Sequence, residues 1–114
     1  MSRLRLHTLV ACDKTVVSTW GDIDLSTSPL LRARLSALAA PGCRLILNLS
    51  HTFYMDGTAL TALAYIHQAL RAGGGELSLV GCRPAVARIL RLSGFDRLFT
   101  VEERPIRVRS VMGA

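Results

Sequence analysis

The sequence predicts a single α/β domain built on a mixed β-sheet, and three observations support this prediction. Short apolar stretches suited to strands alternate with longer segments whose leucines recur at helical spacing. Two strand-like stretches open the chain with only a short polar turn between them, which indicates an antiparallel hairpin. The 114 residues are 50% hydrophobic and 19% charged, enough for one folded core. The expected order is β-β-α-β-α-β-α-β, with parallel pairs after the hairpin and helices packed on the sheet.

The first half of the chain supplies the hairpin and one helix. Residues 4–11 and 15–20 are the predicted strands of the hairpin. The helix is expected to begin at residues 26–29 (STSP), where hydroxyl side chains can cap it and proline suits the first turn. Residues 41–42 (PG) end it. Its inner face is formed by leucines at helical spacing: Leu31, Leu35 and Leu38.

A central strand and a second helix follow. Residues 44–49 form the strand, and its uninterrupted apolar part at 45–47 is typical of a strand buried on both faces. The helix is predicted over residues 58–71 and ends at the glycines of 73–75. Its inner stripe is expected to contain Leu60, Leu63, Leu70 and either Ile66 or His67.

The last part of the chain repeats the alternation of strand and helix. Residues 76–80 are a strand, and a helix with proline in its first turn runs from near Pro84 to residue 93. Its inward residues are expected to be Val86, Ile89 and Leu90. A short final strand lies within 98–101. The predicted domain is therefore 1–101, and 102–114 is expected to be a weakly ordered tail.

Composition excludes several classes of function. No apolar run is long enough for a membrane span, and the start lacks the apolar core of a signal peptide, so a cytoplasmic protein is expected. The net charge is +6, but the arginines are dispersed, so we expect a basic surface suited to an acidic protein partner and no nucleic-acid partner. Neither the histidines nor the cysteines have metal-ligand spacing. No cofactor is expected, and the cysteines are expected to be reduced: Cys12, Cys43 and Cys82.

The strongest candidate site is the stretch from Leu45 to Leu60. A strand runs into a loop, and Asp56, Gly57 and Thr58 then open a helix. A helix N-terminus carries free N–H groups and a partial positive charge, so a hydroxyl placed there is a plausible site for phosphorylation. The alternative is that Asp56 or Thr58 is simply the helix cap.

These motifs, taken together, resemble the STAS domain family of anti-sigma factor antagonists. Residues 21–30 (GDIDLSTSPL) are similar to the segment before the family's first helix, and residues 45–50 (LILNLS) to its L-V-L-D-L-S strand. Residues 53–60 (FYMDGTAL) resemble its F-x-D-S-S-G-L loop. The stretches 75–81 and 86–101 resemble its last strand and helix. The similarity covers residues 5 to 101, at matching spacings.

The resemblance implies a phosphorylation switch. The second serine of the family's loop is phosphorylated by a partner kinase, which is often the ATP-binding anti-sigma factor itself. The unphosphorylated domain binds the anti-sigma factor and frees the sigma factor, and a phosphatase restores that form. By alignment, Asp56 matches the aspartate, Gly57 the first serine, Thr58 the acceptor serine, Ala59 the glycine and Leu60 the leucine.

A protein-binding regulator is therefore the expected function, and three alternatives stay open. One is a STAS-like adaptor subunit of a transporter or sensory complex without phosphorylation. The second is nucleic-acid binding, which only the net charge supports. The third is an enzyme, although no catalytic residues occur at a recognisable spacing. Asp24 could instead cap the first helix, and Tyr54 or Met55 could be a buried staple. The expected partner surface consists of Asp22, Asp24, Tyr54, Met55, Asp56, Gly57, Thr58, Ala59 and Leu60.

Overall fold

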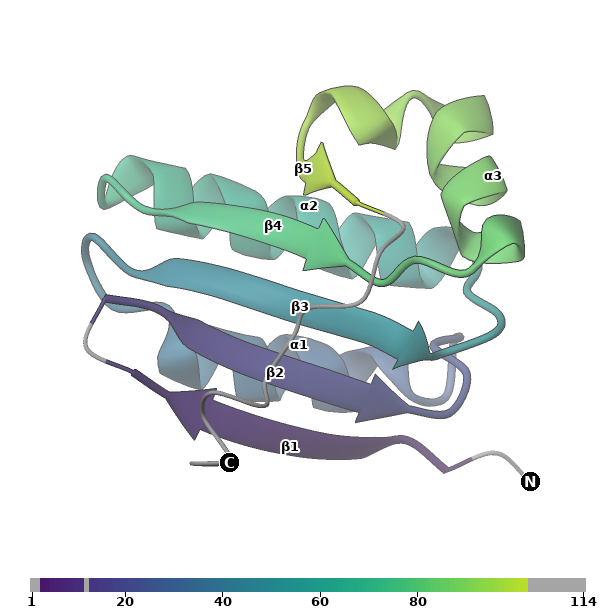
Figure 1. The fold of residues 1–114 in the computed structure, drawn as a ribbon, viewed down its shortest axis with the longest axis horizontal. Helices are drawn as coiled ribbons and strands as arrows, with labels where there is room; N and C mark the ends of the chain where they lie inside the picture. Colours follow the sequence, from purple (N-terminus) through teal and green to yellow (C-terminus); the bar gives the residue numbers. More distant parts are fainter. Residues whose placement is uncertain (1–2, 12, 103–114) are drawn as a thin grey trace, which may run out of the picture.

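The computed structural model describes residues 3–11 and 13–102, and these form a mixed sheet of five strands with helices packed on it (Figure 1). The strands are β1 (Arg5–Val10), β2 (Thr15–Trp20), β3 (Arg44–His51), β4 (Glu76–Val80) and β5 (Thr100–Val101). The helices are α1 (Ser28–Leu38), α2 (Gly57–Ala72), α3 (Pro84–Ser93) and the 3-10 turn η1 (Phe95–Arg97). The predicted fold class and element order are confirmed, and η1 is an addition that the sequence pattern did not predict.

The strands lie in the sheet in the order in which they occur in the chain. The order is β1-β2-β3-β4-β5, with β1 antiparallel to β2 and every later pair parallel. Because β2 and β3 are parallel neighbours, their carboxyl ends meet at one edge of the sheet. The loops that carry the candidate site leave from this edge.

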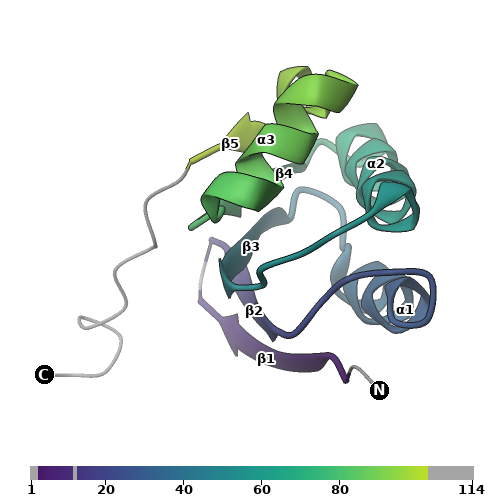
Figure 2. The same ribbon diagram turned by 90° about the vertical axis from the view of Figure 1, so that its right-hand side faces the viewer.

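The core lies between the sheet and one pair of helices. Helices α1 and α2 lie side by side against the same face of the sheet (Figure 2). On β3, Leu45, Leu47 and Leu49 point into this core and are fully buried, whereas Ile46 and Asn48 are half-buried. The prediction that β3 is buried on both faces is therefore wrong for its second face, which is only half-buried because both long helices cover the other one.

Each helix contributes a narrow apolar stripe to the core. The predicted leucines of α1 and α2 are buried except Leu38, which is half-buried at the end of α1, and Ile66 rather than His67 takes the open position on α2. On α3, Val86 and Leu90 are buried as predicted, whereas Ile89 is half-buried and Ala87 is buried in addition. The buried residues of the three helices include Leu31, Leu35, Leu60, Leu63, Ile66, Leu70, Val86 and Leu90.

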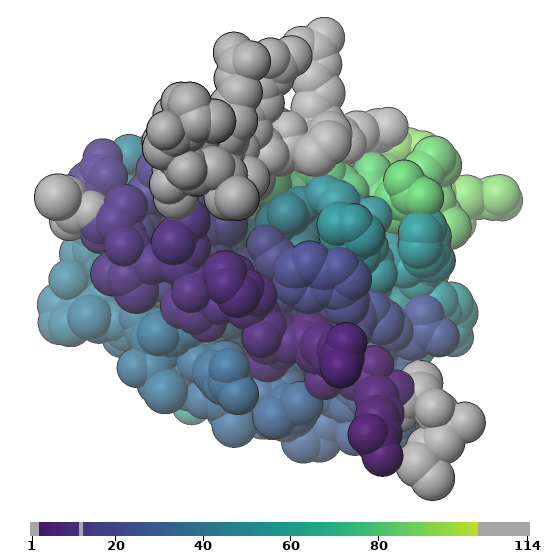
Figure 3. All heavy atoms as spheres, turned by 60° about the horizontal axis from the view of Figure 1, so that its bottom comes forward, coloured from purple at the N-terminus to yellow at the C-terminus, as the bar shows by residue number. Residues whose placement is uncertain are grey.

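Strand β1 forms one edge of the sheet. Figure 3 shows it as the purple ridge that crosses the front of the molecule, beside β2. Its side chains at Arg5 and His7 are exposed. Charged and polar side chains on an edge strand discourage pairing with the edge of another sheet.

The sheet extends one residue beyond the predicted domain boundary. The Glu102 N–H donates to the Leu79 carbonyl at 2.8 Å, and the Cys82 N–H donates to the Glu102 carbonyl at 3.2 Å. The Glu102 backbone is thus hydrogen-bonded to β4 and to the segment that follows it. The rest of the predicted tail, residues 103–114, lies outside the described residues.

Candidate functional site

Two loops that are distant in sequence are hydrogen-bonded into one unit at the carboxyl ends of β2 and β3. The Ile23 N–H donates to the Tyr54 carbonyl at 3.1 Å, and the Asp56 N–H donates to the Ile23 carbonyl at 3.2 Å. Ile23 and Met55 form a parallel bridge, and neither side chain is exposed to solvent. The bridge acts as a short extension of the sheet, and it brings the Asp22–Asp24 segment alongside the start of α2.

Asp56 is the N-cap of α2. Its backbone is extended, and its Oδ1 accepts hydrogen bonds from the N–H groups of Thr58 at 2.9 Å and Ala59 at 3.3 Å. The same oxygen accepts the hydroxyl hydrogen of Thr58. The hydroxyl and the two N–H donors lower the pKa of Asp56, although partial desolvation and the charge of Asp24 oppose the shift. Asp56 therefore stays ionised and holds the Thr58 hydroxyl in one orientation.

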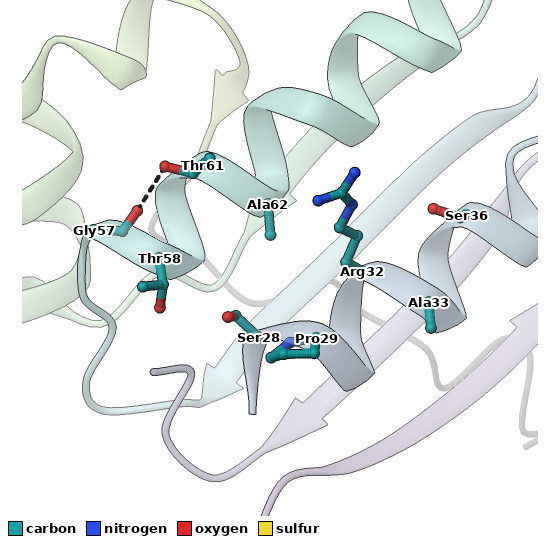
Figure 4. Close-up of a pocket in the computed structure, with 9 residues that line it drawn as sticks. All are labelled: Ser28, Pro29, Arg32, Ala33, Ser36, Gly57, Thr58, Thr61 and Ala62. Atoms are coloured by element: carbon teal, nitrogen blue, oxygen red, sulfur yellow. Dashed lines mark hydrogen bonds between the residues drawn. The ribbon is translucent and has the colours of Figure 1, made fainter. Parts of the chain in front are cut away.

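Thr58 is half-buried in the first turn of α2 and has a slender neighbour on each side. Gly57 is exposed, and a Cβ built on it would meet nothing within 4 Å. Ala59 is buried and adds only a methyl group. One turn later, the Thr61 hydroxyl donates to the Gly57 carbonyl at 3.0 Å (Figure 4). The Thr58 hydroxyl is thus held by Asp56, and the residues before and after Thr58 in the chain have no bulky side chain.

Asp24 organises the turn that leads into α1. Its Oδ1 accepts from the Ser26 N–H at 3.0 Å, the Ser26 hydroxyl at 2.8 Å and the Thr27 N–H at 3.2 Å. These donors, the Ser26 hydroxyl above all, lower the pKa of Asp24. Asp24 thereby stabilises the turn before the helix. Asp24 also lies next to the Asp56 loop, so the contact with a partner protein that the sequence predicted for it stays a prediction.

The predicted hydroxyl cap of α1 is not formed. Helix α1 begins at Ser28, and its N-cap Thr27 makes no side-chain capping hydrogen bond. The Thr27 hydroxyl instead donates to the carbonyl of Asp22 at 2.8 Å and accepts from the Asp24 N–H at 2.9 Å. The expectation of capping hydroxyls is wrong because Thr27 is drawn back into the preceding turn.

The two loops carry exposed apolar side chains. Leu25 is 74% exposed, Phe53 53% and Tyr54 50%, and we call these three residues the apolar rim. The Arg83 guanidinium lies 4.2 Å from the centre of the Phe53 ring, which connects the rim to the start of α3. Large exposed apolar groups in one region are typical of a protein-binding surface.

Several residues of the expected partner surface lie inside the protein. Met55 and Ala59 have no exposed area and Leu60 is 6% exposed, so their side chains pack in the core. For Met55, the buried alternative is therefore correct. The solvent-accessible part of the expected surface is the rim member Tyr54 together with Asp22, Asp24, Asp56, Gly57 and Thr58.

A groove between α1 and α2 begins at Thr58. The groove has a volume of about 520 Å³, and residues of the first turns of both helices line it (Figure 4). Of the described residues that line it, Arg32 alone is charged, and its guanidinium lies 3.8 Å from the centre of the Tyr65 ring. The lining residues are Ser28, Pro29, Arg32, Ala33, Ser36, Gly57, Thr58, Thr61 and Ala62.

The sequence analysis missed the groove, Phe53 and Arg83. The periodicity of a sequence shows which face of a helix is polar, but it does not show which two helices lie side by side and form a groove. Arg83 is also thirty residues from Phe53 in the chain, and no local signal connects them. Phe53 could have been found, because an aromatic residue in a polar loop already suggests a contact surface.

Among the described residues, no group of three or more histidine, cysteine or acidic side chains is arranged to hold a metal ion. In the same part of the chain, no helix has the length and apolar character needed to cross a membrane.

Comparison with known proteins places this geometry in context. The family model described as STAS domain matches residues 6–106. The anti-sigma-B factor antagonist of Bacillus subtilis (strain 168) is 27% identical over 88 residues, which are 77% of this chain and 81% of that protein. An anti-sigma factor antagonist structure from Mycobacterium paratuberculosis has a TM-score of 0.78 at 24% identity, over 97% of this chain and 93% of its own. The phosphorylated form of the Bacillus cell fate determinant SpoIIAA has a TM-score of 0.68 at 18% identity, over 97% of each chain.

Proposed function

The chain belongs to the STAS domain family, and on this premise we propose that it is an anti-sigma factor antagonist switched by phosphorylation of Thr58. The observation that carries the proposal is the Thr58 hydroxyl, held by Asp56 at the start of α2, with the exposed apolar rim on the two loops that lead to α1 and α2. The curated relative from Bacillus subtilis is named for the same role. In this role the protein acts in the cytoplasm by binding, without catalysing a reaction itself.

The unphosphorylated form is the binding form. Leu25, Phe53 and Tyr54 offer apolar area that a partner can desolvate around Thr58. The partner is an anti-sigma factor, which releases its sigma factor when this chain occupies it. The basic surface of the chain suits acidic groups on that partner.

The phosphorylated form is the released form. The kinase transfers the γ-phosphoryl group of ATP to the Thr58 Oγ1. An O–P bond forms there, the bond from the γ-phosphorus to the bridging oxygen breaks, ADP leaves, and the hydroxyl proton goes to a base of the kinase. The product carries about −1.5 to −2 added charge beside Asp56. Desolvating that charge against an apolar partner surface is costly, so the complex dissociates until a phosphatase removes the group.

The test is phosphorylation by a candidate anti-sigma kinase with ATP, followed by mass spectrometry. We expect one phosphate on Thr58, retained in Thr58→Ser and lost in Thr58→Ala. Thr61→Ala is the matched control, because Thr61 is an exposed hydroxyl residue one turn further along α2. A phosphate that maps to another residue would contradict the proposal, and a chain that binds its partner without any label would favour the adaptor alternative.

Binding gives a second readout. Thr58→Glu places a negative charge at the site, and we expect it to weaken binding of the anti-sigma factor about tenfold or more, the equivalent of roughly 1.4 kcal/mol. Gln68→Glu, which adds a charge at an exposed residue of α2 outside the groove, should bind like the wild type. Equal affinity of wild type and Thr58→Glu would show that charge at this position does not operate a switch.

A further inference from the structure

The groove between α1 and α2 lies where the product of Thr58 phosphorylation must find a place. Thr58 and Ser28 line the same end of the groove, and Arg32 rises between the two helices beyond them (Figure 4). The inference below rests on the proposed function, because it concerns the phosphorylated form. It asks which groups of this chain receive the phosphoryl group once it is attached.

Phosphorylation removes the interaction that now holds the Thr58 side chain. The hydroxyl donates its hydrogen to Asp56, and a phosphorylated oxygen has no hydrogen to donate. The contact with Asp56 then becomes a repulsion between two anions, and Asp24 adds to it because its charge already acts on Asp56. The phosphoryl group is therefore driven away from the Asp56 carboxylate.

The groove provides groups that bind an anion. Arg32 supplies a guanidinium, which binds phosphate through paired hydrogen bonds. Ser28 supplies a hydroxyl at the first residue of α1. The first turns of α1 and α2 both line the groove, and neither contains an acidic residue, so both helix dipoles favour negative charge there.

Arg32 is free to exchange its present contact for a phosphate. Its side chain is exposed and lies over the ring of Tyr65, which is itself 46% exposed. A cation–π contact at an exposed ring is weak compared with a charge-assisted pair to a doubly charged anion. The movement needed is a change of side-chain rotamer, with α1 and α2 in place.

We propose that the α1–α2 groove is the receptor of the Thr58 phosphoryl group, with Arg32 and the Ser28 hydroxyl as its ligands. On phosphorylation, Arg32 leaves the Tyr65 ring and pairs with the phosphate. The phosphorylated form then differs from the unphosphorylated form at two points of its surface. The phosphate is held at the groove, and the Tyr65 ring is no longer covered by the Arg32 guanidinium.

The test uses protein in which phosphothreonine is installed at position 58 during synthesis, so that no kinase is required. The second pKa of the phosphothreonine is followed by phosphorus NMR in the wild type, Arg32→Gln and Arg34→Gln. Arg34 is the matched control, because it is an exposed arginine on the same helix that does not line the groove. We expect Arg32→Gln to raise this pKa by about half a unit or more, and Arg34→Gln to leave it near the wild-type value.

A conservative variant and a direct readout complete the design. Arg32→Lys keeps the positive charge but lacks the paired N–H donors of the guanidinium. The phosphothreonine pKa of this variant should therefore lie between those of the wild type and Arg32→Gln. In arginine-labelled protein, the Arg32 Nε–H resonance should shift on phosphorylation while that of Arg34 stays in place. Circular dichroism confirms that each variant is folded.

The outcomes separate this inference from the proposed function. Equal phosphothreonine pKa values in wild type, Arg32→Gln and Arg34→Gln would overturn the receptor groove. That result leaves the switch standing wherever a kinase labels Thr58. Conversely, a kinase that leaves Thr58 unlabelled would overturn the proposed function, while the installed phosphothreonine still reports whether Arg32 receives it.

Discussion

Asp56 combines two tasks in one carboxylate. It caps α2 through two backbone N–H groups, and it orients the hydroxyl of Thr58. The two tasks share one oxygen, so the geometry of the acceptor is coupled to the stability of the helix. A cap at this position is therefore also a positioning residue for the phosphoacceptor.

Substitution of Asp56 tests the cap directly. Asp56→Ala removes the acceptor of both N–H groups and should lower the free energy of unfolding by about 0.5–2 kcal/mol, whereas Asp56→Asn keeps a capping oxygen and should cost less. Urea denaturation followed by circular dichroism measures both values. If Asp56→Ala unfolds at the same urea concentration as the wild type, the cap does not contribute to stability.

At the scale of elements, two glycines near the site have opposite roles. Gly21 joins β2 to the bridged loop with a φ of +116°, and a Cβ there would lie 2.4 Å from the Arg3 carbonyl oxygen. Gly57 opens α2, and a Cβ there would meet no atom within 4 Å. The first glycine is required by the backbone, and the second is not.

Alanine at these two positions should therefore shift stability in opposite directions. Gly21→Ala forces the loop and β1 apart, and we expect a loss of more than about 1 kcal/mol. Gly57→Ala lowers the entropy of the unfolded chain and should be neutral or stabilising by up to about 1 kcal/mol. Thermal unfolding of the two variants beside the wild type measures this, and a Gly21→Ala protein as stable as the wild type would contradict the role of the Gly21 backbone.

The packing of α2 against the β5 side of the sheet involves His67. Its ring meets the Phe99 ring edge-on with the centroids 5.1 Å apart, and within the described residues its buried Nδ1 has no hydrogen-bond partner. Burial lowers the pKa of His67, the charge of Arg71 lowers it further, and Glu76 acts in the opposite direction. The folded protein therefore prefers the neutral imidazole.

This preference predicts a pH dependence. The pKa of His67 in the folded protein lies below its unfolded value of about 6.5. The contribution of the neutral His67 to the free energy of unfolding is therefore fully present above about pH 6.5 and is lost as the pH falls through the folded pKa. His67→Leu removes the titrating group, so its stability should fall less than that of the wild type between about pH 7 and pH 5. Urea denaturation across this range tests it; parallel curves would show that His67 does not link protonation to folding.

At the scale of the whole molecule, the features that the sequence patterns predicted are mostly ones that depend on near neighbours in the chain. The cap at Asp56 acts over three residues, and the leucine stripe of α2 over one helix, so both were visible. The Ile23–Met55 bridge joins residues of different loops, and only the fold reveals that it buries Met55. The burial of Ile46 likewise depends on where α1 and α2 lie, which an apolar run cannot indicate.

The charge of the molecule also acts as a whole, and it should steer the partner. Fourteen basic and eight acidic residues leave a net charge of +6, so an acidic partner is attracted over distances that salt shortens. We expect the association rate with the anti-sigma factor to fall roughly tenfold between 0.1 M and 1 M salt, with a smaller change in dissociation rate. Stopped-flow mixing or surface plasmon resonance measures both rates.

The position of a charge should matter as much as the total. Arg83 is exposed and lies over Phe53 of the apolar rim, whereas Arg44 is exposed at the start of β3, the opposite end of that strand from the site. Each glutamine substitution removes one unit of charge, but only the charge at Arg83 lies in the path of an approaching partner. Arg83→Gln should therefore slow association more than Arg44→Gln, and the difference should disappear at 1 M salt because the screening length shrinks to about 3 Å. Equal rates for the two variants at 0.1 M salt would mean that the partner is attracted by net charge alone, without steering toward the rim.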